Sequence, residues 1–99
     1  MLPLNMAVHL QGAYGMTTKQ KILRRILTGS KNVRFSDVVN LVEGFGFRLS
    51  RTDGSHHIFI HSDIPELINL QEVKGKAKPY QMRQFLKLVE RYSLKLKEE

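Results

Sequence analysis

The spacing of apolar residues predicts two helices in the first half of the chain. Between residues 17 and 29, apolar side chains recur on one helical face, and Thr17-Thr18 offers a hydroxyl N-cap. A second helix is expected to begin at Phe35 with Ser36 as its N-cap, and to end at Gly44. The apolar faces are formed by Ile22, Leu23, Ile26 and Leu27 in the first helix and by Val38, Val39, Leu41 and Val42 in the second.

A change of hydrophobic period after Gly46 predicts strands. Residues 47–51 alternate between apolar and polar, so one face of this strand should be buried and the other wet. Residues 52–55 read Thr-Asp-Gly-Ser, a strong hairpin signal, and residues 56–61 form the expected returning strand. Residues 67–73 predict a third strand, followed by a basic loop at residues 74–78.

The helical period returns after Pro79, which suits the first turn of a helix. Met82, Phe85, Leu86 and Val89 follow i, i+3, i+4, i+7 spacing, which predicts an amphipathic helix packed on the sheet. The expected fold class is therefore α+β, with a three-stranded antiparallel sheet and helices on one face. The other face of the sheet is free to carry a site.

The length and composition of the chain indicate a single domain. Its 99 residues are enough for one modest core, and 41% hydrophobic and 25% charged residues are ordinary globular values. Residues 1–15 show no sustained period and contain Pro3, Gly12 and Gly15, so we expect a flexible N-terminal extension there. Residues 16–99 form the expected domain.

The charge of the chain favours a polyanionic partner. Sixteen Lys and Arg residues against nine Asp and Glu residues give a net charge of +7. Neutralising phosphates with such residues releases condensed counterions, although small soluble proteins are also often basic without any such role. Residues 74–97 hold eight basic residues and one acidic residue, so the positive field is concentrated in the C-terminal third.

Other features narrow the class of protein. The chain has no cysteine, which excludes disulfides and thiolate metal sites and agrees with a reducing compartment. No apolar run approaches the roughly 18 residues that cross a bilayer, and the N-terminus lacks the pattern of a secretory signal. We therefore expect a cytoplasmic protein that is not associated with a membrane.

The most unusual segment is Gly-Ser-His-His-Ile-Phe at residues 54–59. On a strand, His56 would share a face with Ile58 and Ile60, while His57 and His61 would occupy the other face. Along an extended strand His57 and His61 lie roughly 13 Å apart, whereas zinc needs each ligand within about 2.1 Å. The spacing therefore argues against a metal site, and we expect no cofactor.

General acid–base chemistry is the functional interpretation of His56, because imidazole exchanges a proton near neutral pH. His56 follows the Gly54-Ser55 turn, where backbone amides and a hydroxyl can approach a phosphate. Arg48 and Arg51 on the preceding strand either face the same substrate or form a solvated strand edge. The alternative for His56 is a structural role, capping the turn or stacking on an aromatic ring.

The segment FSDVVNLVEGFGFRLSRTDGSHHIFIH, residues 35–61, resembles the HicA toxins of bacterial toxin–antitoxin pairs. The shared features are a short helix ending in Gly-Phe, a basic strand, and Gly-Ser-His before an aromatic residue. The resemblance continues to about residue 94, where FLKLVERYSL is similar to the closing helix of the family, so the family core is expected at 35–94. Two features depart from the family pattern: residues 67–80 lack the Pro-X-His segment of many members, and the helix near 17–29 is additional.

The resemblance implies a small ribonuclease with a fold like a double-stranded-RNA-binding domain, which cleaves mRNA until a HicB antitoxin binds it. The histidine of Gly-Ser-His is the family's catalytic residue, which corresponds to His56 here. The expected function is thus the toxin of a toxin–antitoxin pair, a metal-independent endoribonuclease whose partners are mRNA and a HicB-like antitoxin.

In the expected reaction, His56 removes the proton of a ribose 2′-hydroxyl, whose oxygen attacks the adjacent phosphorus. Arg48, Arg51 or Lys74 offsets the growing negative charge, and His57, His61 or water protonates the leaving oxygen. The expected RNA-binding residues are Gly54, Ser55, Arg48, Arg51, Lys74, Lys76 and Lys78. Two alternatives remain: a noncatalytic RNA-binding module of the same fold, and a protein-interaction domain that attracts an acidic partner.

Overall fold

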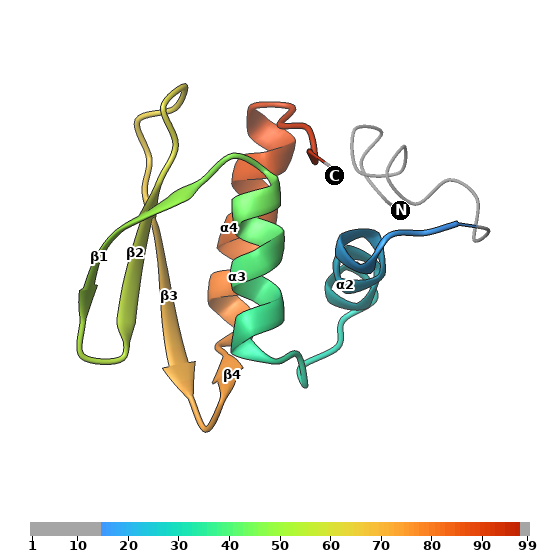
Figure 1. The fold of residues 1–99 in the computed structure, drawn as a ribbon, viewed down its shortest axis with the longest axis horizontal. Helices are drawn as coiled ribbons and strands as arrows, with labels where there is room; N and C mark the ends of the chain where they lie inside the picture. Colours follow the sequence, from blue (N-terminus) through green and yellow to red (C-terminus); the bar gives the residue numbers. More distant parts are fainter. Residues whose placement is uncertain (1–14, 98–99) are drawn as a thin grey trace.

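The computed structural model describes residues 15–97, which form three helices and four strands (Figure 1). In chain order these are α2 (Thr18–Leu27), α3 (Phe35–Gly44), β1 (Arg48–Asp53), β2 (His56–Ile60), β3 (Ile68–Val73), β4 (Lys76–Ala77) and α4 (Pro79–Arg91). Apart from Gly15, the expected flexible extension at residues 1–15 lies outside the described residues. No helix within residues 15–97 is long and apolar enough to cross a membrane.

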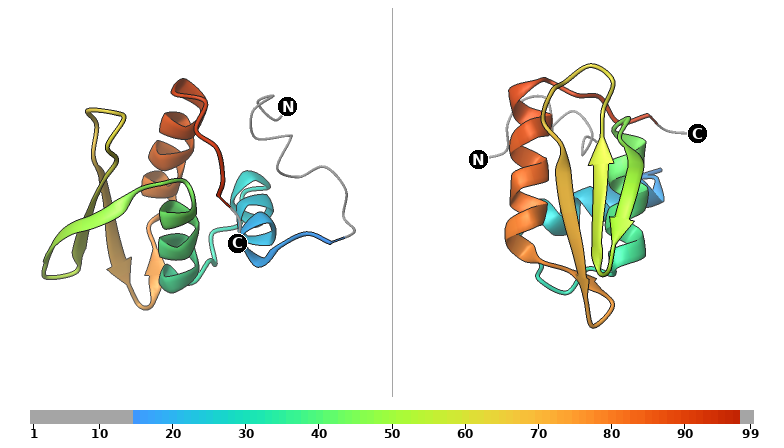
Figure 2. Two further views of the ribbon diagram at one scale, coloured as in Figure 1. Left: turned by 45° about the horizontal axis from the view of Figure 1, so that its top comes forward. Right: turned by 90° about the vertical axis from the view of Figure 1, so that its left-hand side faces the viewer.

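The strands form one antiparallel sheet in the order β1-β2-β3-β4, and α3 and α4 cover one of its faces (Figures 1 and 2). The predicted α+β class is confirmed, but the prediction of three strands was wrong. The segment at residues 74–78, expected as a loop, is a hairpin in which Val73 pairs with Lys76. Lys74 and Gly75 turn the chain with φ of 52° and 78°. A strand of two residues is too short to show the alternation from which strands are predicted.

The hydrophobic core lies between the helices and the sheet face that they cover. Phe59 of β2 and Leu70 of β3 pack there with residues of all three described helices, including the fully buried Leu23, Leu41 and Phe85. The C-terminal segment returns beside α3, where the Lys97 amide donates to the Gly44 carbonyl at 2.7 Å.

The prediction that one face of the first strand, residues 47–51, is buried holds for Phe47 and was wrong for the rest of the strand. All six residues of β1 are exposed, including Leu49 at 47%. The physical reason is the position of the strand: β1 is the edge strand farthest from the helices (Figure 1), so an apolar residue on it has no helix to pack against.

Helix α3 begins at the predicted residue but is capped differently. Ser36 lies within the first turn, and the N-cap is Arg34, whose carbonyl accepts from the Asp37 and Val38 amides. The Phe35 amide donates to the Gly75 carbonyl at 2.8 Å, so the β3–β4 hairpin satisfies an amide at the start of the helix. A contact between distant segments has replaced the local cap predicted from Ser36.

Candidate functional site

His56 is the first residue of β2 and directly follows the tight turn at Gly54-Ser55. Gly54 has φ of 60°, a conformation that favours glycine at the first central position of a two-residue hairpin loop. His56 pairs with Asp53 on β1 and with Gln71 on β3. The side chain is half-buried, so it remains partly open to solvent.

The His56 ring belongs to the face of the sheet opposite the helices, called the open face below. Phe59 points into the core, and side chains alternate along a strand, so His56 and Ile58 lie on the other side. Ile58 is buried but is not part of the main core cluster, which agrees with this assignment. The predicted division of the histidines between two faces is thus supported.

The ring of His56 contacts a residue that sequence reasoning missed. Its Nδ1 lies 3.2 Å from Oδ1 of Asn69, on β3, which with β2 forms the inner part of the sheet. Asn69 pairs with Ile58 and is therefore a diagonal neighbour of His56 on the open face. The alternation of apolar and polar residues at 68–71 (INLQ) indicates that Asn69 faces away from the core. It does not indicate that Asn69 contacts His56.

A bulge in β1 brings the two predicted arginines to the open face. Arg48 pairs with Ile60 and Arg51 pairs with Ile58, and the register shifts between Leu49 and Arg51. In a regular strand, residues three apart point to opposite faces, but one extra residue restores the same face. Arg51 is the diagonal neighbour of His56 on β1, as Asn69 is on β3, and all three belong to the open face. Both guanidinium-bearing residues are exposed.

The three predicted lysines have different positions. Lys76 pairs with Val73 and so belongs to the open face, two strands from His56. Lys74 is exposed in the hairpin turn, and Lys78 is the N-cap residue of α4, beyond the end of the sheet. The fold therefore groups Arg48, Arg51 and Lys76 with His56 and places Lys74 at the margin of this surface.

The other two histidines of the segment lie on the side of the helices. The His57 ring packs against Phe35 with 4.7 Å between ring centroids, and its Nδ1 lies 3.1 Å from the Ser55 carbonyl oxygen. The His61 ring lies against Phe47 with 5.0 Å between centroids, and its Nδ1 accepts the Asp63 amide at 3.0 Å. Neither ring shares the open face with His56.

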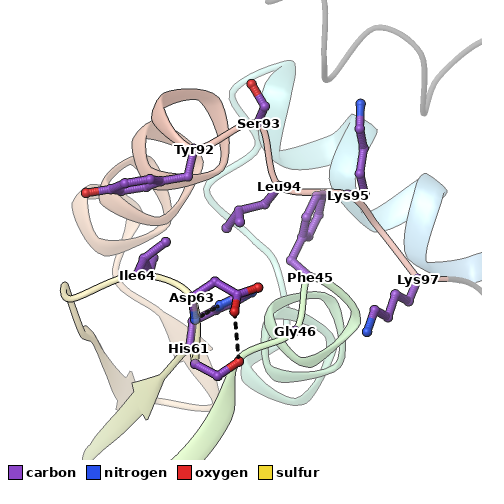
Figure 3. A pocket seen from close by; sticks show the side chains of 11 residues that line it. Phe45, Gly46, His61, Asp63, Ile64, Tyr92, Ser93, Leu94, Lys95 and Lys97 are labelled. Carbon is purple, nitrogen blue, oxygen red and sulfur yellow. Dashed lines mark hydrogen bonds between the residues drawn. The ribbon is translucent and has the colours of Figure 1, made fainter.

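A surface cavity of about 390 Å³ lies beside His61 (Figure 3). Phe45, Ile64 and Leu94 form its apolar part, and Asp63 and Lys97 are among its polar lining residues. It lies at the end of β2 opposite to His56, so the two belong to different regions of the molecule. Within residues 15–97, no three His, Cys, Asp or Glu side chains are grouped to hold a metal ion.

Comparison with known proteins relates this fold to one family. The family model described as HicA toxin of bacterial toxin-antitoxin matches residues 35–90, more than half of the 99-residue chain. The match begins at the first residue of α3 and ends within α4, so it contains the whole sheet and excludes α2. No curated protein and no solved structure matches the chain.

The family match includes His56, both open-face arginines and all three lysines of the β3–β4 region. It implies a role as a toxin and a cognate antitoxin as partner. The chain therefore belongs to the HicA family of toxins of bacterial toxin–antitoxin systems.

Proposed function

We propose that this toxin is a metal-independent endoribonuclease that cleaves mRNA in the cytoplasm, with His56 as the general base. The observation that carries the proposal is the composition of the open face. A partly exposed imidazole lies on the same sheet face as Arg48 and Arg51. Diagonal neighbours such as Arg51 and His56 lie roughly 7–8 Å apart, close enough for long side chains to share a ligand.

His56 would act on the ribose 2′-hydroxyl of the bound RNA. It takes the hydroxyl proton, the 2′-oxygen forms a bond to the adjacent phosphorus, and the bond from phosphorus to the 5′-oxygen breaks. The leaving 5′-oxygen takes a proton from water, since His57 and His61 face the helices. The hydroxide that remains takes the proton from His56, which restores the base. The products are a 2′,3′-cyclic phosphate and a free 5′-hydroxyl, and DNA is resistant because it lacks the nucleophile.

Cationic side chains would stabilise the negative charge that develops on the phosphorane oxygens. Arg51 is best placed, as the diagonal neighbour of His56, and Arg48 follows it along the same face. Lys74 lies farther away, in the turn beyond β3. Its proposed role is therefore to bind the RNA backbone rather than the reacting phosphate.

The remaining predicted residues would hold the RNA strand. Gly54 and Ser55 present a tight turn beside His56, and Lys76 and Lys78 continue the positive surface toward α4. The order of helix α3, strands β1 to β3 and helix α4 supports the expected likeness to a double-stranded-RNA-binding fold. A HicB-like antitoxin would inhibit the toxin by covering this basic surface.

The test compares two adjacent histidines on opposite sheet faces. His56→Ala should abolish cleavage of mRNA in a purified assay and growth arrest in cells, while the affinity for RNA stays nearly unchanged. The matched control is His57→Gln, which should retain cleavage because His57 packs against Phe35 on the other side.

Full cleavage by His56→Ala would reject His56 as the base, whatever the result for His57→Gln. RNA that is retained by the unmodified protein without any chain scission would instead support a noncatalytic RNA-binding module.

A further inference from the structure

One side-chain contact on the open face joins His56 to Asn69. Asn69 lies on β3, which is next to β2 and contacts α4, and its side chain is half-buried. Its Oδ1 is 3.2 Å from His56 Nδ1. An amide oxygen only accepts hydrogen bonds, so this contact requires a proton on Nδ1 of the imidazole. In the neutral ring, the lone pair is then on Nε2.

We propose that Asn69 is a positioning residue, which holds His56 in the tautomer with the proton on Nδ1 and so makes Nε2 the basic atom. The tautomer of a histidine is set by the hydrogen bond that its other nitrogen makes. Because Asn69 on β3 holds Nδ1 of the His56 ring, Nε2 keeps a defined position. The catalytic part of this inference rests on the proposed function, whereas the tautomer does not.

The chemical type of the partner matters as much as its position. A carboxylate in place of the amide would also accept from Nδ1, but it would place a negative charge beside the phosphate that the open face must bind. Asp53 already faces His56 from β1. A neutral amide orients the ring without adding a further charge, so it suits a base that acts next to an anionic substrate.

The tautomer can be measured in the full chain without any substrate. Nitrogen-15 NMR of histidine-labelled protein should show neutral His56 with its proton on Nδ1. Asn69→Ala should shift His56 toward the Nε2-protonated form, and Asn69→Asp should restore the Nδ1 proton because the acceptor is kept.

Gln71→Ala is the matched control for the NMR experiment. Gln71 is the other amide residue beside His56 on β3, and its side chain makes no hydrogen bond to the ring among the described contacts. Its replacement should leave the tautomer unchanged. A proton on Nε2 in the unmodified protein, or an unchanged tautomer in Asn69→Ala, would overturn the proposal.

Cleavage kinetics then test the positioning role. Asn69→Ala should lower kcat roughly 10- to 100-fold, the range typical for losing a group that orients a metal-ligating histidine, with RNA affinity little changed. Asn69→Asp should recover part of the rate and move the acidic limb of the pH–rate profile to higher pH, since a carboxylate stabilises imidazolium.

The two experiments separate the possible failures. If His56→Ala cleaves normally, the proposed function fails while the NMR result still decides whether Asn69 sets the tautomer. If His56 is essential but Asn69→Ala cleaves as fast as Gln71→Ala, the positioning role is rejected. Thermal unfolding of each variant reports whether a loss of rate reflects a loss of folded protein.

Discussion

Gly46 connects α3 to β1 in a conformation that other residues rarely adopt. Its φ is 98°, and a Cβ atom at this position would lie 2.7 Å from Nε2 of His61. Nδ1 of His61 accepts the Asp63 amide, and Nε2 lies next to Gly46. His61 therefore packs against the turn that leads from α3 into β1.

Gly46→Ala should therefore lower the free energy of unfolding by more than the conformational cost alone. That cost is about 1–2 kcal/mol for a non-glycine residue in the left-handed region, and displacement of His61 adds to it. Gly29→Ala is the matched control, since Gly29 has φ of 88° with no atom within 4 Å of the added Cβ. Urea unfolding of both variants is the measurement. Equal losses would show that His61 moves away without cost.

The loop between β2 and β3 contacts the end of α4 through Glu66. The Tyr92 hydroxyl lies 2.7 Å and 2.8 Å from the two Glu66 carboxylate oxygens, and Arg91 Nη1 lies 3.0 Å from Oε2. The hydrogen bond from Tyr92 holds the pKa of Glu66 below its ordinary value of 4.5. The same bond raises the pKa of Tyr92 above its ordinary value of 10.0.

These shifts predict stability that is lost at both ends of the pH range. Glu66 has a lowered pKa, so its contribution is present above about pH 4.5 and is lost as the carboxylate is protonated. Tyr92 has a raised pKa, so its contribution is present below about pH 10 and is lost as the hydroxyl ionises. Tyr92→Phe should destabilise the protein most near neutral pH, and the difference from the unmodified protein should shrink on both sides.

Unfolding by urea at several pH values checks this prediction. Tyr80→Phe is the control, because the Tyr80 hydroxyl accepts from the neutral Gln81 amide and its effect should not change on the acidic side. A Tyr92→Phe effect that does not shrink at any pH below 4.5, the ordinary pKa of the carboxyl group, would contradict the account.

The lysines of the β3–β4 region are proposed to bind the RNA backbone. Replacing Lys74, Lys76 and Lys78 together by alanine should weaken RNA binding and flatten its dependence on salt, because fewer counterions are released. The control variant replaces three other lysines by alanine, Lys21, Lys87 and Lys95, which are exposed outside the sheet. Each of the two variants lowers the net charge of the chain from +7 to +4. Identical salt slopes for the two variants would mean that only net charge matters.

At the scale of the whole molecule, α2 is part of the main core although the family match begins after it. Leu23 has no exposed area, and Ile22 and Ile26 join the same buried cluster as α3, β3 and α4. The side chain of Lys19 on α2 also lies next to Gly44 on α3. The extra helix is therefore integrated into the domain rather than appended to it.

This arrangement predicts that damage to α2 unfolds the whole domain. Leu23→Ala should cost about 2–5 kcal/mol, the usual range for a fully buried leucine, and unfolding should remain a single transition. Leu41→Ala on α3 is the matched comparison, since that residue is also fully buried. If α2 were a separate unit, Leu23→Ala would leave the main transition unchanged while Leu41→Ala would lower it. Circular dichroism during urea unfolding distinguishes these outcomes.

Local pattern was sufficient for the helices and the longer strands. The apolar spacing around Leu23 and Phe85 predicted α2 and α4, and the alternation around Phe59 and Leu70 predicted β2 and β3. These signals are local because a helix or strand repeats its buried face every few residues. The cap of α3 was missed because it depends on the contact between Phe35 and the distant Gly75. Strand β4 was missed because its two residues, which pair with β3, are too few to show an alternation.

Some features of the candidate site could be read from the local sequence, whereas others required the tertiary structure. The turn at Gly54, the histidine that follows it and the basic residues nearby were all visible in consecutive letters, because turn chemistry and side-chain type are properties of the local chain. The placement of Arg48 and Arg51 on one face with His56, and the contact of His56 with Asn69, required the fold. The bulge in β1 sets the first and the register between β2 and β3 sets the second. Both are properties of a pair of strands, so neither can be read from the pattern of one strand alone.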